Sequence, residues 1–135
     1  MLKRVLKNQK GVTLVELLAV IVILGIIALI AVPLISGVIE DSREDSVRSS
    51  AINLINSTEL YDVTNNNSEG GSYSSGDDEY LSYINDRESA DFSGATVIVE
   101  PNGASTISGT VQVNDTSLEF PDGTTVSDIN DGAGN

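Results

Sequence analysis

A single carboxylate, Glu16, stands directly before an apolar run that carries no charge from residue 17 to residue 39. An ionised side chain in a membrane span is costly, because an acidic residue at the bilayer centre costs roughly 2.5–3.5 kcal/mol on insertion scales. A cationic partner relieves this cost, and removing one partner of a buried pair costs about 3–5 kcal/mol. Glu16 is therefore the first candidate functional residue, and the chemistry to look for is an ion pair.

Few other residues could support catalysis or hold a cofactor. The chain contains no histidine and no cysteine, which removes the usual general base, the commonest metal ligand and any disulfide framework. Every lysine lies in the first ten residues, and paired carboxylates such as Asp77 and Asp78 are typical of a solvated surface. We predict a protein that is not an enzyme, with no catalytic residue, no metal site and no cofactor.

Charge is distributed unevenly along the 135 residues. The seven basic residues include four in the first ten positions, whereas all 20 acidic residues lie at or after Glu16. Phosphate binding requires clustered lysine and arginine. We therefore expect no direct binding of nucleic acid.

The apolar run itself is long enough to cross a membrane. A helix over residues 17–39 rises about 34 Å, and the hydrocarbon core is about 30 Å thick. The basic residues before it predict that the N-terminus stays in the cytoplasm and the acidic part goes outside. A secretory signal peptide cleaved near Ser36 and Gly37, or a permanent signal anchor, would account for part of this pattern. The run is longer than the usual signal peptide core, and neither alternative explains Glu16.

A family resemblance explains the charge. The sequence resembles the cleavage and methylation signature of type IV prepilins and pseudopilins at Gly11-Val12-Thr13-Leu14-Val15-Glu16-Leu17-Leu18, at Gly25 and at Ala31-Val32-Pro33. The resemblance covers residues 1 to about 40. It departs from the family at Val12, where phenylalanine or methionine is more frequent.

The resemblance implies a processing pathway and a set of partners. Residues 1–11 would be a leader, which prepilin peptidase removes between Gly11 and Val12 before it N-methylates Val12. The subunit would wait in the membrane and then join a homo-oligomeric helical filament, served by an assembly ATPase and an inner-membrane platform protein. Glu16 would contact the Val12 amine of a neighbouring subunit, which is cationic because an α-amine has a pKa near 8.

Gly25 and Pro33 lie within the predicted apolar helix. Proline lacks a backbone donor and clashes with the preceding turn. We therefore expect a kink or local melting over residues 29–33. Two interpretations stay open: an incidental kink, or a stretch that loosens while the subunit is extracted from the membrane.

After residue 39 the helical pattern continues but becomes amphipathic, so that one helix is predicted from about residue 13 to residue 62. The helix is predicted to have two parts, a membrane or filament-core half at 12–39 and an amphipathic half at 40–63. In the second half, Glu44 and Arg48 are spaced to form an ion pair. The expected inward residues are Val47, Ala51, Ile52, Leu54, Ile55 and Leu60. A polar connector follows at 64–94, with a short helix at 77–85 that turns Tyr80, Leu81 and Ile84 inward.

The last third alternates as strands do. Segments 95–100, 106–114, 116–120 and 124–126 are separated by turn residues at 101–103, 114–115 and 122–123. The expected inward residues are Ile107, Val111, Val113, Leu118 and Phe120. We predict an α+β fold with a three- or four-stranded antiparallel sheet over 95–127 on the long helix, and a frayed tail at 128–135.

Three functions follow from this reading. The first is a structural subunit of a type IV pilus or pilus-like filament at the cell surface, used for example in adhesion. The second is a pseudopilin of a type II secretion or DNA-uptake (competence) system, which would share the same N-terminus. The third is a membrane-anchored surface protein that does not polymerise.

Overall fold

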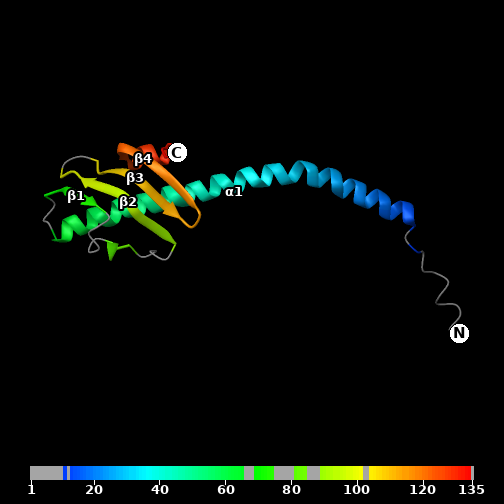
Figure 1. Ribbon diagram of the computed structural model, residues 1–135, viewed down its shortest axis with the longest axis horizontal. Coiled ribbons are helices and arrows are strands. Elements are labelled where there is room, and N and C mark those ends of the chain that lie inside the picture. Colours follow the sequence, from blue (N-terminus) through cyan, green and yellow to red (C-terminus); the bar gives the residue numbers. More distant parts are fainter. Residues whose placement is uncertain are drawn as a thin grey trace, which may run out of the picture. The chain divides into compact units, whose positions relative to one another are not determined.

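The computed structural model describes Gly11 and residues 13–65, 69–74, 81–84, 89–101 and 104–134. Figure 1 shows its elements, which are the helix α1 and a four-stranded antiparallel sheet, followed by a short helix, α3. They span Leu14–Asn65 (α1), Gly71–Ser74 (β1), Ala90–Val99 (β2), Thr106–Val113 (β3), Thr116–Thr125 (β4) and Val126–Asn130 (α3). The chain divides into two compact units, Met1–Ile39 and Glu40–Asn135. The predicted α+β class is confirmed.

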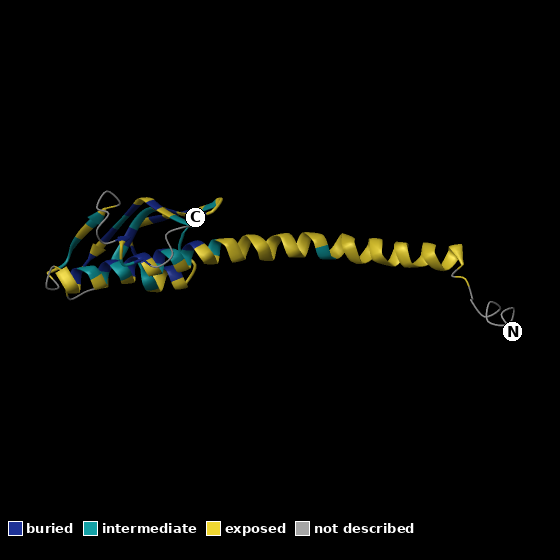
Figure 2. Ribbon diagram, turned by 90° about the horizontal axis from the view of Figure 1, so that it is seen from below, coloured by how far each residue is buried: buried dark blue, intermediate teal, exposed yellow. Residues whose placement is uncertain are grey.

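In the first unit, α1 buries almost nothing. In Figure 2 the ribbon over residues 14–39 has the colour of exposed residues, and only Ala31 in this range is intermediate. Within the described residues, α1 is the one helix that is long and apolar enough to cross a membrane. The helix runs without interruption through Gly25 and Pro33. Near the proline, the Ser36 hydroxyl donates to the Val32 carbonyl at 3.0 Å.

In the second unit, the other half of α1 packs against one face of the sheet (Figures 1 and 2). Its fully buried residues are Val47, Ala51, Leu54, Ile55, Thr58 and Asp62. The prediction was wrong at Leu60, whose side chain is 54% exposed. Each residue turns the helix by about 100°, so Leu60 points away from the line that Thr58 and Asp62 continue. The helix ends at Asn65, slightly beyond the predicted residue 62.

The hairpin of β3 and β4 follows the sequence pattern. Val113 pairs with Thr116 across the turn residues Asn114 and Asp115, and Asn114 has a positive φ of 52°. Asparagine tolerates this left-handed backbone in a two-residue hairpin turn. The five residues predicted to point inward are all buried: Ile107, Val111, Val113, Leu118 and Phe120.

The strand β2 begins at Ala90, whereas the sequence pattern predicted a start at residue 95. A bulge near its start breaks the alternation on which the prediction relied. Asp91 pairs with Gln112 but Gly94 pairs with Thr110, so β2 contains one extra residue between them. The Asp91 carboxylate accepts a hydrogen bond from the Ser93 N–H at 2.8 Å within the bulge. The extra residue shifts the inward parity, so that Phe92 faces the same core as Ala95, Val97 and Val99.

A second irregularity joins the two last predicted strands into one. The turn expected at residues 122–123 is a bulge within β4, because Ile107 pairs with Thr124 while Gly109 pairs with Phe120. The Thr124 hydroxyl closes the bulge by donating to the Pro121 carbonyl at 2.6 Å. Proline is tolerated here because β4 is an edge strand of the sheet.

Two elements were missed in the sequence. The strand β1 lies within the predicted connector and pairs with β2. The prediction of a frayed tail at 128–135 was wrong. The helix α3 begins with a capping box of Thr125 and Asp128, and its Ile129 is only 1% exposed. Of the short helix predicted at 77–85, the structure describes only residues 81–84, where Leu81 and Ile84 are buried as expected. Tyr80 lies outside the described residues.

Candidate functional site

The start of α1 is closed by a reciprocal pair of hydrogen bonds. The Glu16 carboxylate accepts from the Thr13 backbone N–H at 2.8 Å, and the Glu16 N–H donates to the Thr13 hydroxyl at 3.3 Å. This capping box satisfies two of the backbone donors that a helix leaves unpaired at its N-terminus. The spacing of Thr13 and Glu16 carries this signal, which the sequence reading did not use.

The position of Glu16 in the first turn also suits its charge. The N-terminus of a helix carries a partial positive charge, which favours a carboxylate there. An ionised carboxylate has about four acceptor sites. The hydrogen bond from Thr13 therefore leaves Glu16 able to accept from a further donor.

The structure places the other predicted residues along the same segment. Gly11 is exposed and precedes the helix, and Val12 lies outside the described residues. Gly25 and Pro33 lie farther along α1. The hydrogen bonds of Glu16 within the described residues are with Thr13 and not with either of them. A Cβ built on Gly25 would meet no heavy atom within 4 Å. This glycine therefore leaves a flat position on the apolar surface, where another helix can approach closely.

The apolar half of α1 requires a non-aqueous partner. Its leucine, isoleucine and valine side chains are roughly half to four-fifths exposed from Leu14 to Ile39. Soluble monomers rarely expose apolar patches larger than a few hundred Å². This exposed apolar surface fits a helix that is anchored in a membrane.

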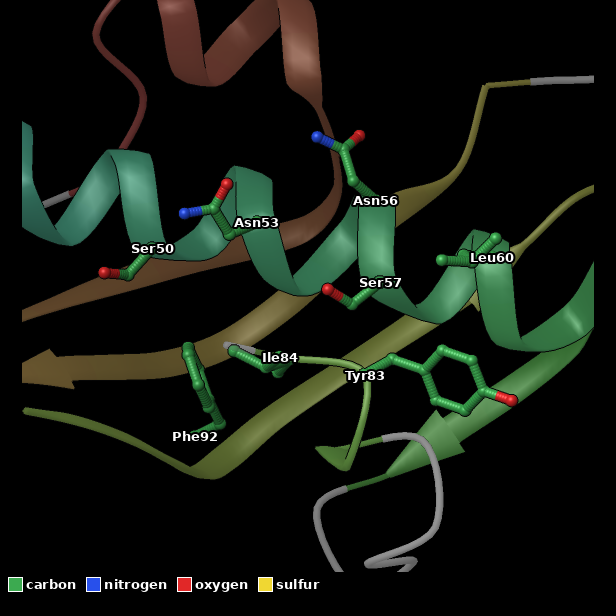
Figure 3. Close-up of a pocket in the computed structure, with 8 residues that line it drawn as sticks. All are labelled: Ser50, Asn53, Asn56, Ser57, Leu60, Tyr83, Ile84 and Phe92. Carbon is green, nitrogen blue, oxygen red and sulfur yellow. The ribbon is translucent and has the colours of Figure 1, made fainter. Parts of the chain in front are cut away.

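The second unit has a groove that is lined by uncharged polar and apolar side chains. Figure 3 shows this groove between α1 and the residues Tyr83, Ile84 and Phe92. Its volume is about 280 Å³. The α1 side contributes hydroxyl, amide and aliphatic side chains, namely Ser50, Asn53, Asn56, Ser57 and Leu60. None of these lining residues is acidic or basic, so the groove offers hydrogen bonds without a charged acid or base. The described residues also contain no group of three or more acidic side chains that could hold a metal ion.

Sequence reasoning missed one buried carboxylate, Asp62, which is 1% exposed. It accepts hydrogen bonds from the Tyr73 hydroxyl at 2.6 Å and from the Gly70 N–H at 3.3 Å. The Tyr61 ring packs edge-on against Tyr73 at 5.8 Å between centroids. Asp62 thereby fastens the end of α1 to β1, which is a structural role.

Comparison with known proteins gives a match at the N-terminal part of the chain. A family model described as the prokaryotic N-terminal methylation motif matches residues 6–32. No curated protein and no solved structure matches the chain. The matched span includes Gly11, Val12, Glu16 and Gly25, and it enters the exposed apolar half of α1. The chain therefore carries, at the start of its long apolar helix, the signature that type IV pilins and pseudopilins share.

Proposed function

We propose that this protein is a structural subunit of a type IV pilus or pilus-like filament. The observation that carries the proposal is the methylation motif at residues 6–32, which continues directly into a membrane-length helix with an exposed apolar surface. Such a helix lies in the membrane before assembly. In the filament it packs against the same helix of other subunits, at the cell surface.

Processing comes first in this proposal. Prepilin peptidase cuts between Gly11 and Val12 and N-methylates Val12. Gly11 is exposed and lies before the helix, which begins at Leu14. The cut removes four of the seven basic residues and creates a new α-amine at the edge of the apolar segment.

Glu16 then supplies the assembly contact. We infer that its carboxylate pairs with the Val12 amine of a neighbouring subunit in the filament. The pair forms in apolar surroundings, where losing one partner costs about 3–5 kcal/mol. It also fixes the axial register, which uniform leucine and isoleucine packing leaves loose.

The stretch before Pro33 is proposed to loosen during extraction from the membrane. Pro33 has no N–H, so the Leu29 carbonyl lacks its usual partner four residues along the helix. The stretch is nevertheless helical in the free chain. Loosening would therefore accompany assembly.

A pseudopilin of a secretion or DNA-uptake system is the second candidate, because the same motif is shared by both classes. A pilus subunit is abundant in long surface filaments, whereas a pseudopilin forms short assemblies. Microscopy of sheared filaments therefore separates the two. A membrane-anchored protein that does not polymerise would be absent from the sheared fraction.

The test of the Glu16 contact uses two substitutions that separate its two roles. Glutamine keeps the capping box but loses the charge, whereas alanine loses both. We expect Glu16→Gln and Glu16→Ala to be processed and inserted normally but to be almost absent from sheared filaments. The matched control is Glu59→Ala, which removes a carboxylate from the soluble half of the same helix and should leave filaments unchanged. Wild-type filament yield in Glu16→Gln would show that capping, and not an ion pair, is what Glu16 provides.

A further inference from the structure

Positive charge is scarce in the processed chain. Cleavage after Gly11 leaves three arginines against 20 acidic residues, a net side-chain charge of −17. Arg87 lies outside the described residues, which leaves Arg43 and Arg48 as the described cations beyond the leader. Chains of this charge repel one another, so each arginine that can reach a second copy matters for assembly.

Arg48 is already engaged within its own chain. Its guanidinium contacts the Glu44 carboxylate at 3.2 Å and the Asp45 carboxylate at 3.3 Å. Its Nε donates to the Ala133 carbonyl at 3.2 Å, which holds the C-terminal segment against α1. Only 17% of its side chain is exposed. Arg48 therefore has little capacity for an external partner.

Arg43 differs from Arg48 both in its exposure and in its lack of partners among the described residues. Its side chain is exposed, and it forms no ion pair or hydrogen bond with the residues that the structure describes. It lies on the wall of a recess of about 340 Å³ between α1 and the turn of the β3–β4 hairpin. The hydroxyls of Ser42 and Ser46 line the same recess, and they too have no partner among the described residues.

One carboxylate, Asp115, also lines this recess. It forms no ion pair with Arg43 within the described structure. Its negative charge near Arg43 opposes the binding of an anion, so an anion in the recess would need direct hydrogen bonds from the guanidinium and the two serine hydroxyls.

We propose that this recess binds an aspartate or glutamate side chain of a second copy of the chain in the filament. The inference rests on the proposed function and names a contact in addition to that of Glu16. A guanidinium fork matches a carboxylate with two parallel hydrogen bonds. Because acidic residues outnumber arginines 20 to three after cleavage, and 19 of the 20 lie at or after residue 40, the second unit of a neighbouring subunit supplies many candidate carboxylates.

The first experiment compares filament yields of full-length variants expressed in the producing cells. Arg43→Gln should lower the mass of sheared filaments about tenfold, and Arg43→Lys, which keeps the charge, should lower it less. Ser117→Asp is the matched control, because it changes the net charge equally at an exposed position of β4. Wild-type yield in Arg43→Gln would overturn the proposal, and so would an equal loss in Ser117→Asp, since that would indicate a general charge effect.

The second experiment identifies the partner. Arg43→Glu is combined in turn with an arginine at each exposed carboxylate of residues 40–134. We expect at least one combination to restore filaments, and restoration by none would overturn the carboxylate as the partner. Normal processing and unchanged amide exchange in β3 show that the variants fold. If the wild-type chain itself forms no filaments, the proposed function fails, whereas normal filaments from Arg43→Gln contradict only this inference.

Discussion

Among single residues, the buried carboxylate Asp62 matters most for the second unit, and no sequence pattern indicates its role. Asp62 occupies an inward position of α1 where a hydrophobic residue is expected, and it is almost fully buried. Burying a carboxylate is favourable only when hydrogen bonds satisfy it. The Tyr73 hydroxyl at 2.6 Å supplies one such bond, from a strand that begins after the end of the helix.

Tyr73→Phe should therefore destabilise the second unit. Hydrogen bonds to charged groups contribute about 1.5–3 kcal/mol, and the substitution removes only this donor. The measurement is native-state amide exchange of β2, which pairs with β1. Tyr83→Phe is the control, because its hydroxyl accepts an exposed bond of 3.3 Å from Asn65. Equal losses in the two variants would contradict a special role for Asp62.

The sequence singles out Glu16 as a candidate, whereas it gives no such signal for Asp62. Glu16 stands out because it is the last charge before a long uncharged run, and its motif is local in sequence. The bond between Asp62 and Tyr73 depends on where the chain turns after α1. No spacing rule connects those two residues, so the fold had to be known before the contact could be seen.

At the scale of elements, two glycines of the sheet meet the same backbone requirement in different surroundings. Gly109 in β3 has φ +94° and Gly123 in β4 has φ +84°. A Cβ on Gly109 would collide with the Gly94 carbonyl of β2, whereas a Cβ on Gly123 would meet nothing within 4 Å. Gly109 thus allows β2 and β3 to approach, while Gly123 serves only the bulge in β4.

These surroundings predict different costs for the same substitution. Gly123→Ala should cost about 1–2 kcal/mol, which is the penalty of a left-handed backbone for a residue with a Cβ. Gly109→Ala should cost more, because the backbone of β2 must also move. Urea unfolding of the detergent-solubilised chain, followed by tyrosine signals, measures both. A smaller loss for Gly109→Ala than for Gly123→Ala would show that the close approach is not required.

The capping box of α3 makes this element sensitive to acid. A hydrogen bond from the Thr125 N–H lowers the pKa of Asp128 below its ordinary value. A lowered pKa in the folded state means that the contribution to stability is present above the unfolded pKa, near 3.9, and is lost as pH falls through the folded value. The protection factor of the Ile129 amide, which corrects the observed exchange rate for the intrinsic rate at each pH, should therefore fall on acidification below about pH 4. In Asp128→Ala this pH-dependent step should disappear, and its persistence would assign the effect to another carboxylate.

The elements that the sequence predicted well have regular local patterns. The β3–β4 hairpin follows from alternation around Asn114 and Asp115, and the long helix follows from its apolar runs. The start of β2 was missed because the bulge after Asp91 breaks the alternation. The strand β1 contains glycine, serine and tyrosine without an apolar pattern, and α3 is too short to show helical periodicity, although the spacing of Thr125 and Asp128 is a capping signal.

At the scale of the whole molecule, the two units have different requirements. The second unit has its own core, formed by α1, the sheet and Ile129 of α3. The first unit has an apolar surface and no core, so it needs lipid or neighbouring subunits. A change from membrane to filament would therefore replace lipid with neighbouring helices around the first unit, whereas the second unit would gain contacts only at its surface. The core of the second unit need not unfold.

In the proposed assembly, cleavage after Gly11 creates the amine with which Glu16 pairs. The most direct test is intact mass spectrometry of the subunit recovered from sheared surface filaments. We expect a chain that begins at Val12 and carries one additional methyl group. A chain that retains residues 1–11, or an unmethylated chain that begins near Gly37, would contradict it.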